Sequence, residues 1–225
     1  MSDPSKETLK LHAAQAALQF VVPGAILGVG SGSTVNVFVS LLEPIRSTIP
    51  GAVAASKSTE AALRTAGIPI LDLNAVESIP VYVDGADEID PDFSLIKGGG
   101  AALTREKIIP TASDTFVCIV DASKRVKQLG TFPLPIEVVP MAINSITRSI
   151  ARMGGIATVR AGVVTDNGNL ILDVRGLSFV DTALLESELN QLPGVVTNGI
   201  FAKRRADICI CAGVDGVTVE RRPAT

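Results

Sequence analysis

Short apolar runs alternate with amphipathic stretches along most of the chain, and this pattern predicts alternating strands and helices. Residues 5–20 have the spacing of an amphipathic helix, and the apolar run 25–29 that follows predicts a strand. Further apolar runs predict strands at 51–55, 68–73, 79–83, 93–96 and 115–120, with a helix beginning near Ser58. Repeated strand–helix units predict an α/β fold, in which helices flank a mostly parallel sheet.

The pattern changes after Thr131. Strands are predicted at 133–140, 157–164, 170–174 and 194–201, and helices at 142–153 and 181–192. The order βαββαβ is typical of a ferredoxin-like α+β unit. The fully apolar run 207–212 is suited to rejoining the first sheet. We therefore expect a Rossmann-like domain of residues 1–131 plus 206–225, with a smaller ferredoxin-like domain inserted at 132–205.

Composition indicates a globular protein without nucleic-acid or membrane partners. The chain has 225 residues, of which 47% are hydrophobic and 19% charged, and this is enough for one large core or a main domain with a smaller companion. No apolar run approaches membrane-spanning length, and the start MSDPSKETLK lacks the build of a secretory signal, so a cytoplasmic protein is expected. A net charge of −3 argues against binding to phosphate backbones.

The single histidine and the three cysteines narrow the possible chemistry. Cys118, Cys209 and Cys211 lie in apolar runs, which favours buried, reduced thiols over a disulfide framework or a soft-metal site. His12 falls in the N-terminal helical pattern, where a surface position is expected. A Ser-His-Asp triad or a multi-histidine zinc site is thus nearly excluded, and acid–base work falls to carboxylates or lysines.

One acid-rich stretch could supply such groups. Residues 81–107 contain four carboxylates within seven residues, then Lys97, three consecutive glycines, and a helix that opens with 104–107. Taken alone, the acids could form a solvated loop or a calcium site, although the EF-hand spacing fails. The charged residues at 105–107 could be a helix surface. We expect Glu88 and Asp90 to face solvent.

A glycine-rich turn at residues 28–34 predicts an anion cradle. It follows a strand and precedes a helix, so backbone N–H groups and the helix N-terminus can approach a negative charge. Gly32 stands where a P-loop needs Lys, and Ser33 where the dinucleotide fingerprint needs Gly. A small phosphorylated ligand therefore suits this loop better than a nucleotide. A turn that only packs a strand on a helix is the alternative.

The segments GVGSGST, DGADEID, LIKGGGAALTREKI, DASK, FPLPIEVVPMA and GVVTDNGNLILDV occur in this order, and the chain resembles the A-type ribose-5-phosphate isomerases. The resemblance runs from the first helix nearly to the C-terminus. It implies interconversion of ribose 5-phosphate and ribulose 5-phosphate in the non-oxidative pentose phosphate pathway, without metal or cofactor. It also implies a homodimer or homotetramer.

The resemblance further implies roles for individual residues. Glu106 matches the general base, and Asp84 and Asp87 match acids that hold sugar hydroxyls and assist ring opening. Lys97 matches a contact to the reacting end of the sugar. The other residues implied to bind substrate are Ser31, Gly32, Ser33, Thr34, Gly85, Ala86, Gly98, Gly99, Gly100, Lys124 and Lys10, of which Ser31–Thr34, Lys124 and Lys10 match phosphate contacts. Many relatives carry Thr where this chain has Ser31, which keeps the hydroxyl.

These residues meet the chemical needs of an aldose–ketose isomerase. The reaction requires one base that reaches two neighbouring carbons and a group that stabilises the enediolate oxygen. A non-catalytic sugar-phosphate sensor is the main alternative, but no basic helix-turn-helix segment accompanies it. A sugar-phosphate deaminating isomerase or an acyl-CoA transferase on the same architecture is a third possibility, and the lack of a catalytic histidine counts against the former.

Overall fold

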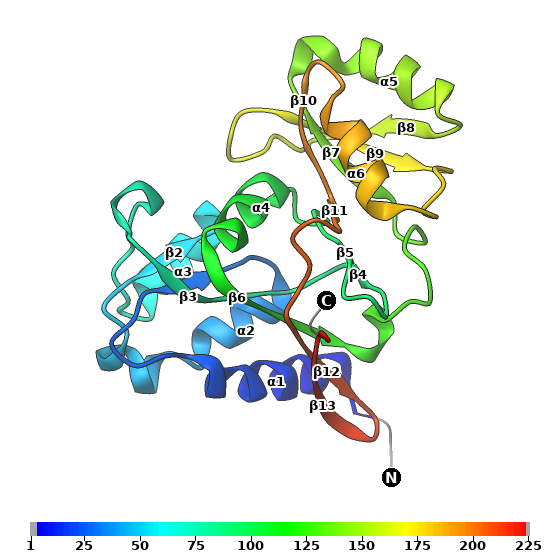
Figure 1. Ribbon diagram of the computed structural model, residues 1–225. Coiled ribbons are helices and arrows are strands. Elements are labelled where there is room, and N and C mark those ends of the chain that lie inside the picture. Colours follow the sequence, from blue (N-terminus) through cyan, green and yellow to red (C-terminus); the bar gives the residue numbers. More distant parts are fainter. Residues whose placement is uncertain (1–3, 224–225) are drawn as a thin grey trace. The chain divides into compact units, whose positions relative to one another are not determined.

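The computed structural model describes residues 4–223, and these fall into two compact units. The first unit comprises the chain up to Ala86, Arg105–Arg125, and the chain from Ala206 onward. The second comprises Asp87–Thr104 and Val126–Arg205. Figure 1 shows the elements of both units with the labels used below.

The first unit is built on a six-stranded sheet with the strand order β13-β12-β6-β3-β1-β2. Five of its strands are parallel neighbours, and only the edge strand β13 is antiparallel. The mostly parallel sheet predicted from the sequence is thus confirmed. The strands are β1 (Leu27–Val29), β2 (Ala52–Ala54), β3 (Ile79–Asp84), β6 (Ser113–Asp121), β12 (Ile208–Gly213) and β13 (Gly216–Arg221).

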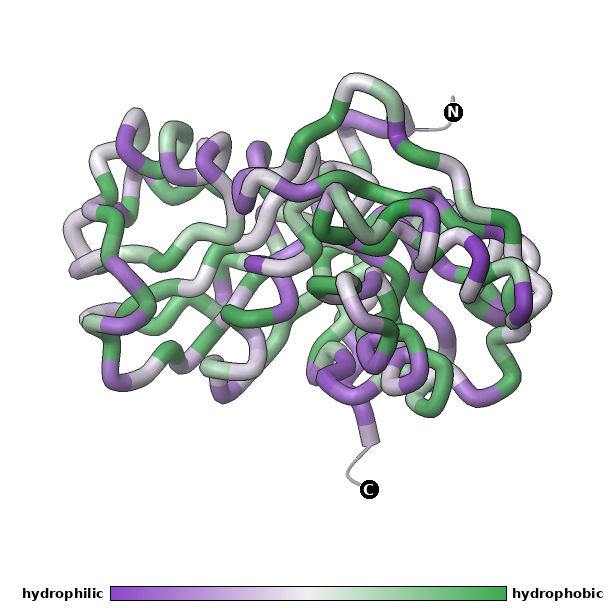
Figure 2. Tube along the Cα trace, turned by 90° about the horizontal axis from the view of Figure 1, so that it is seen from above, coloured by the Kyte–Doolittle hydropathy of each residue, from purple (hydrophilic) through white to green (hydrophobic). Residues whose placement is uncertain are grey.

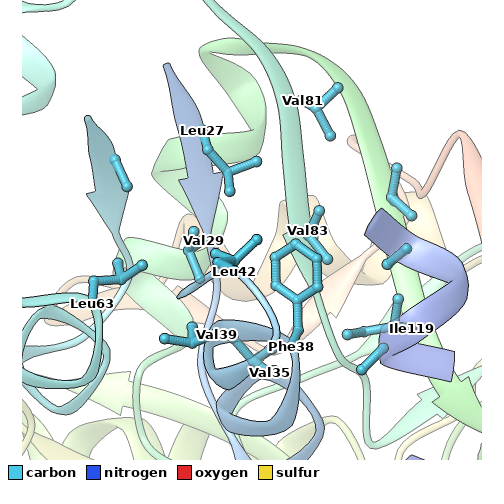
Figure 3. Close-up of a cluster of buried hydrophobic side chains, with 14 of the residues drawn as sticks. Leu27, Val29, Val35, Phe38, Val39, Leu42, Leu63, Val81, Val83 and Ile119 are labelled. Carbon is cyan, nitrogen blue, oxygen red and sulfur yellow. The ribbon is translucent and has the colours of Figure 1, made fainter. Parts of the chain in front are cut away.

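Helices cover both faces of this sheet. Successive side chains of a strand point to opposite faces, and the strands carry apolar side chains on both. Leu27, Val29 and Val83 point to one face, where α1 and α2 pack, and Figure 3 shows Phe38 pointing from α2 toward these strands. On the other face, Ile109 of α4 lies against Gly28. The helices of this unit are α1 (Lys6–Ala17), η1 (Leu18–Phe20), α2 (Ser33–Ser40), η2 (Glu43–Thr48), α3 (Lys57–Thr65), η3 (Leu73–Ala75), η4 (Ala122–Lys124) and α4 (Leu103–Thr111), whose first two residues belong to the second unit.

The second unit contains a four-stranded antiparallel sheet with the order β10-β7-β9-β8. In chain order these strands are the fourth, first, third and second, which is the ferredoxin-like arrangement expected from the βαββαβ pattern. The unit also contains η5 (Pro140–Ala142) and a small sheet of β4 (Glu88–Ile89), β5 (Leu95–Ile96) and β11 (Ile200–Phe201). The main elements are β7 (Leu134–Val138), α5 (Ile143–Arg152), β8 (Ile156–Val159), β9 (Leu170–Arg175), α6 (Thr182–Asn190) and β10 (Val195–Asn198).

Three predicted strands differ from the structure. Residues 68–73 form a single bridge between Ile70 and Ala52, so the prediction of a strand there is wrong. The strand predicted at 157–164 ends at Val159. The one predicted at 194–201 divides at Gly199, where a Cβ atom would lie 2.3 Å from the Lys97 carbonyl oxygen, and its second part joins β5 instead of β7.

The division into units also differs from the predicted domain limits, 1–131 plus 206–225 and 132–205. Residues 87–104 and 126–131 belong to the second unit. The cause is the small sheet, because β4 pairs with β5 and β5 pairs with β11. Hydrophobic and hydrophilic residues are interspersed along the coloured part of the trace in Figure 2. None of the helices described between residues 4 and 223 is long and apolar enough to cross a membrane.

Candidate active site

The predicted anion cradle lies at the carboxyl end of β1. Gly30, Ser31 and Gly32 connect this strand to α2, and Gly32 caps the helix with a φ of +99°, which favours glycine. β1 lies between β2 and β3, so the chain leaves it in one direction and later returns on its other side. In open α/β sheets, the crevice outside such a switch point is where ligands bind.

Asp84 ends β3 beside this loop and is fully buried. Its Oδ1 accepts hydrogen bonds from the backbone N–H groups of Ser31 at 3.0 Å and Gly85 at 2.7 Å, and Oδ2 accepts one from the Tyr82 hydroxyl. A Cβ atom on Gly30 would lie 1.9 Å from the carboxyl carbon of Asp84. The carboxylate therefore occupies space that only a glycine at position 30 leaves open.

Tyr82 supports this carboxylate through its hydroxyl group. Burial raises the pKa of its phenol well above the ordinary value, and the negative charges of Asp84 and Glu106 raise it further. The hydroxyl consequently remains a proton donor to Asp84 at any physiological pH. Sequence reasoning did not single out Tyr82, although the two-residue spacing on one strand places both side chains on the same face of the sheet.

Glu106 lies in the first turn of α4 and is only 3% exposed. Its Oε1 accepts a hydrogen bond of 2.6 Å from the Ser31 hydroxyl. Ser31 thus binds both carboxylates, with its backbone N–H on Asp84 and its side chain on Glu106. Ser31 was predicted to contact the phosphate, whereas in the structure it contacts the two acids.

The other predicted residues of the first unit lie on separate elements. Ser33 and Thr34 form the first turn of α2, and Lys124 ends η4, directly after β6 reaches the same carboxyl edge of the sheet. Lys10 lies in α1, where it forms an ion pair of 2.7 Å with Glu7. The hydrogen bonds of Ser31 bring Asp84 and Glu106 together in this unit, and the N–H of Gly85, another predicted residue, also binds Asp84.

A nearby contribution from α3 was missed. The Thr59 hydroxyl, 1% exposed, donates a hydrogen bond of 2.8 Å to the carbonyl oxygen of Gly30. Ser56 caps the same helix by accepting a hydrogen bond from the Thr59 N–H at 3.0 Å. The N-terminus of α3 thereby holds the glycine loop from the side of β2.

The second unit holds Asp87 and the lysine–glycine segment. Asp87 accepts a hydrogen bond of 2.8 Å from the Gly99 N–H, and a Cβ atom on Gly99 would lie 2.6 Å from its Oδ1. Lys97 is 3% exposed, and its ammonium lies 5.9 Å from the ring centre of Phe201. Gly98 has a φ of +104°, so the backbone turns there in a way that favours glycine.

Two other acids of the stretch were predicted to face solvent, but the structure buries one fully and the other in part. Glu88 is 3% exposed and accepts hydrogen bonds from the N–H groups of Gly130 at 2.7 Å and Phe132 at 2.5 Å, so this expectation was wrong. Asp90 is half-buried and accepts from the N–H groups of Asp92 and Ser94, while burial raises its pKa. Both acids hold loop backbone in place.

The remaining candidate groups have structural positions. His12 is exposed on α1, as predicted. The three cysteines are buried in β6 and β12, and burial raises the pKa of Cys209 to about 12. Within residues 4–223, no three side chains of His, Cys, Asp or Glu gather closely enough to hold a metal ion.

Comparison with known proteins identifies the family. Residues 51–216 match the family model of ribose 5-phosphate isomerase A (phosphoriboisomerase A). The chain is 53% identical to ribose-5-phosphate isomerase A of Methylibium petroleiphilum over 96% of this chain and 99% of that one.

Solved structures agree. Ribose 5-phosphate isomerase A of Neisseria gonorrhoeae superposes with a TM-score of 0.96 at 40% identity, covering 99% of this chain and 100% of that one. A D-ribose-5-phosphate isomerase in complex with phospho-erythronic acid gives 0.92 at 40% identity, covering 97% and 100%. With its parallel sheet and ferredoxin-like second sheet, this chain belongs to the ribose 5-phosphate isomerase A family.

Proposed function

We propose that this protein interconverts D-ribose 5-phosphate and D-ribulose 5-phosphate in the non-oxidative branch of the pentose phosphate pathway. The observation that carries this proposal is the pairing of Glu106 with Ser31 beside Asp84. It places a buried carboxylate, held by a hydroxyl, at the switch point of a parallel sheet where ligands bind. The family to which the chain belongs gives the substrate.

Glu106 is the general base. Its carboxylate removes the proton from C2 of the open-chain aldose, and the electron pair of that C–H bond forms the enediolate while the carbonyl oxygen takes up negative charge. A proton passes from the C2 hydroxyl to the negatively charged O1, and the protonated carboxyl returns the first proton to C1, so that the C2 carbonyl of the ketose forms. The hydrogen bond from Ser31 fixes the direction in which the carboxylate points, and a fixed base is what proton transfer between two neighbouring carbons needs.

The other residues bind the sugar and stabilise charge. Asp84 and Asp87 hold sugar hydroxyls and assist ring opening, with Gly85 and Ala86 between them in the same motif. Lys97 and the amides of the segment Gly98–Gly100 stabilise the enediolate oxygen. Gly32, Ser33 and Thr34 at the N-terminus of α2 bind the phosphate together with Lys124, and Lys10 adds a further positive charge. Every step uses side chains and backbone of the protein, without metal or cofactor.

The decisive experiment is an isomerase assay on the purified protein with ribose 5-phosphate in the presence of EDTA. We expect ribulose 5-phosphate to form at the same rate with EDTA as without it. Absence of any ketose product would contradict the isomerase and favour the alternative, a non-catalytic sugar-phosphate sensor. Loss of activity on chelation would contradict the metal-free reaction.

Exchange of Glu106 for Gln tests the base. Glu106→Gln keeps the size of the side chain and its acceptor for the Ser31 hydroxyl but cannot take up a proton at ordinary pH. We expect kcat to fall at least about a thousandfold, with binding of phospho-erythronic acid largely intact. A variant that keeps most of its activity would show that another group is the base.

We further propose that the chain works as a homodimer or homotetramer in the cytoplasm. Members of the family are usually assembled in this way. Light scattering on the eluting protein gives the mass of the assembly, and a monomeric mass at assay concentrations would contradict this part of the proposal.

A further inference from the structure

The backbone between Lys97 and α4 is held in an unusual conformation. Gly98 has a φ of +104°, and Ala101, which carries a Cβ atom, has a φ of +61°. A residue with a side chain is strained in this left-handed region, and the conformation persists only where surrounding contacts fix it. These contacts matter, because the segment carries the amides assigned above to the enediolate oxygen.

Arg160, directly after β8, makes the first of these contacts. Its Nη1 donates hydrogen bonds of 3.0 Å to the carbonyl oxygens of both Gly98 and Gly99. The other edge of the guanidinium binds Asp173 of β9, with Nε donating at 2.9 Å and Nη2 at 2.5 Å. The Arg160 side chain is only 17% exposed. A planar fork with donors on two edges can serve both partners at once, and a lysine ammonium cannot.

This contact fixes the direction of two peptide groups. In a trans peptide the carbonyl and the N–H point in opposite directions. The peptide between Gly98 and Gly99 is held at both ends, by Arg160 on the carbonyl and by Asp87 on the Gly99 N–H. In the next peptide, Arg160 holds the Gly99 carbonyl, so the Gly100 N–H is aimed away from Arg160. An N–H with a fixed direction is the kind of donor that stabilises a developing oxyanion.

Glu137 of β7 holds the far end of the segment. It is fully buried, and its Oε1 accepts hydrogen bonds of 2.8 Å from Thr165 and from Asn169. Its Oε2 accepts one from the hydroxyl of Thr104. Thr104 lies in the first turn of α4, two residues before Glu106. The buried carboxylate thereby ties the start of this helix to the loop that follows β8.

We infer that Arg160 and Glu137 are positioning residues for the isomerase. They hold the two ends of residues 98–104 so that the Gly100 N–H meets the enediolate oxygen in the reactive geometry. This inference rests on the proposed function. Arg160 acts through the glycine carbonyls and Glu137 through Thr104.

Exchange of Arg160 for Lys tests the first anchor. Arg160→Lys keeps the charge but loses the fork, and we expect kcat to fall about ten- to a hundredfold while KM changes less than about threefold, because the lost geometry matters most in the transition state. The carboxylate of phospho-erythronic acid resembles an enediolate, so its affinity should fall by a factor close to that for kcat/KM. Arg152→Lys, at the exposed end of α5, is the matched control and should leave all three unchanged.

A pair of isosteric variants tests the second anchor. Thr104→Val removes the hydrogen bond between α4 and Glu137, and kcat should fall about three- to tenfold. Thr165→Val removes a donor from the same carboxylate on the side away from α4. It should lower the stability of the fold yet leave kcat of the folded enzyme unchanged. Equal kcat losses in both variants would overturn the role of Glu137, because they would indicate a structural effect alone.

Amide hydrogen exchange separates this inference from the proposed function. Residues 98–104 should exchange faster in Arg160→Lys than in Arg152→Lys, whether or not the protein isomerises the pentose. Wild-type protein without isomerase activity would defeat the proposed function, and the exchange result would then decide whether Arg160 orders the segment. An active wild type whose Arg160→Lys variant shows unchanged kcat and exchange would overturn the inference alone. If Arg160→Lys fails to fold, Asp173→Asn, which weakens the same fork, takes its place in each comparison.

Discussion

Position 30 shows how a single atom can decide the geometry of the site. A Cβ atom there would overlap the carboxyl group of Asp84. We expect Gly30→Ala to push this carboxylate out of place and to lower kcat about a hundredfold, the usual result of moving a reacting group by about 1 Å. Gly213→Ala is the control, because its Cβ atom would lie an ordinary 3.5 Å from Ala122. Similar losses in both variants would contradict this explanation.

Ser31 offers a second test at the residue scale. Ser31→Ala removes the hydroxyl that orients Glu106, and hydrogen bonds to charged groups are worth about 1.5–3 kcal/mol. The expected loss in kcat is therefore about ten- to a hundredfold. Ser31→Thr restores the hydroxyl and should be at least about tenfold more active than Ser31→Ala in the same assay. Equal activity of the two variants would show that the hydroxyl is unimportant.

The sequence could name the acids but not their partners. Asp84 and Glu106 stand out because their motifs combine carboxylates, a lysine and glycines. The hydrogen bond from Ser31 to Glu106 joins residues 75 positions apart, and it depends on the path of the glycine loop. The burial of Glu88 was missed for a similar reason, since its donors at Gly130 and Phe132 lie in a loop more than 40 residues away.

At the scale of elements, α3 stabilises the loop through Thr59. Thr59→Val keeps the shape of the side chain but removes a donor from the buried carbonyl of Gly30, which should lower the free energy of unfolding by about 1–3 kcal/mol. Thr65→Val, an exposed change in the last turn of the same helix, should cost less than about 0.5 kcal/mol. Urea unfolding of both variants measures the difference, and equal costs would assign the effect to helix propensity.

Elements with continuous apolar runs were predictable, and those determined by distant pairing were not. The central parts of β3, β6 and β12 are buried on both faces, so their sequences contain runs of hydrophobic residues. β13 is almost entirely exposed and was not predicted. Residues 68–73 are apolar enough for a strand, yet Pro69 lacks the N–H that a regular ladder needs, and one bridge forms.

The whole molecule should lose stability at alkaline pH. Tyr82 and Cys209 have raised pKa values in the folded state, the latter about 12, so the folded protein keeps protons that the unfolded chain releases. Their contribution to the free energy of unfolding is complete below about pH 9. It is lost as the pH rises, beginning at about pH 9 for the thiol and about pH 10 for the phenol, and each group then loses about 1.4 kcal/mol per pH unit.

Two measurements check this expectation. Urea unfolding at increasing pH gives the slope, and Tyr82→Phe should remove the part that begins near pH 10. Since the chain has a single tyrosine, the absorbance of tyrosinate reports Tyr82 alone. Titration of this absorbance near pH 10 in the folded protein would contradict the predicted shift.

The general architecture followed from the sequence, because both periodicities and the change of pattern after Thr131 are local. The limits of the compact units did not, since Asp87–Thr104 joins the second unit through β5, which pairs with β4 on one side and with β11 on the other. Pairing between strands so far apart leaves no trace in the composition of either.

The place of β12 inside the sheet has a consequence for biosynthesis. This strand lies between β6 and β13, yet it is made about 90 residues after β6. A ribosome therefore releases β1, β2, β3 and β6 long before their sheet can be completed, and one flank of β6 stays open while the ferredoxin-like unit is being translated. That unit contains its four strands in one continuous stretch and can fold first. Until residues 208–221 emerge, the nascent chain exposes an unpaired strand edge, which chaperones can bind and which can pair with other chains and aggregate.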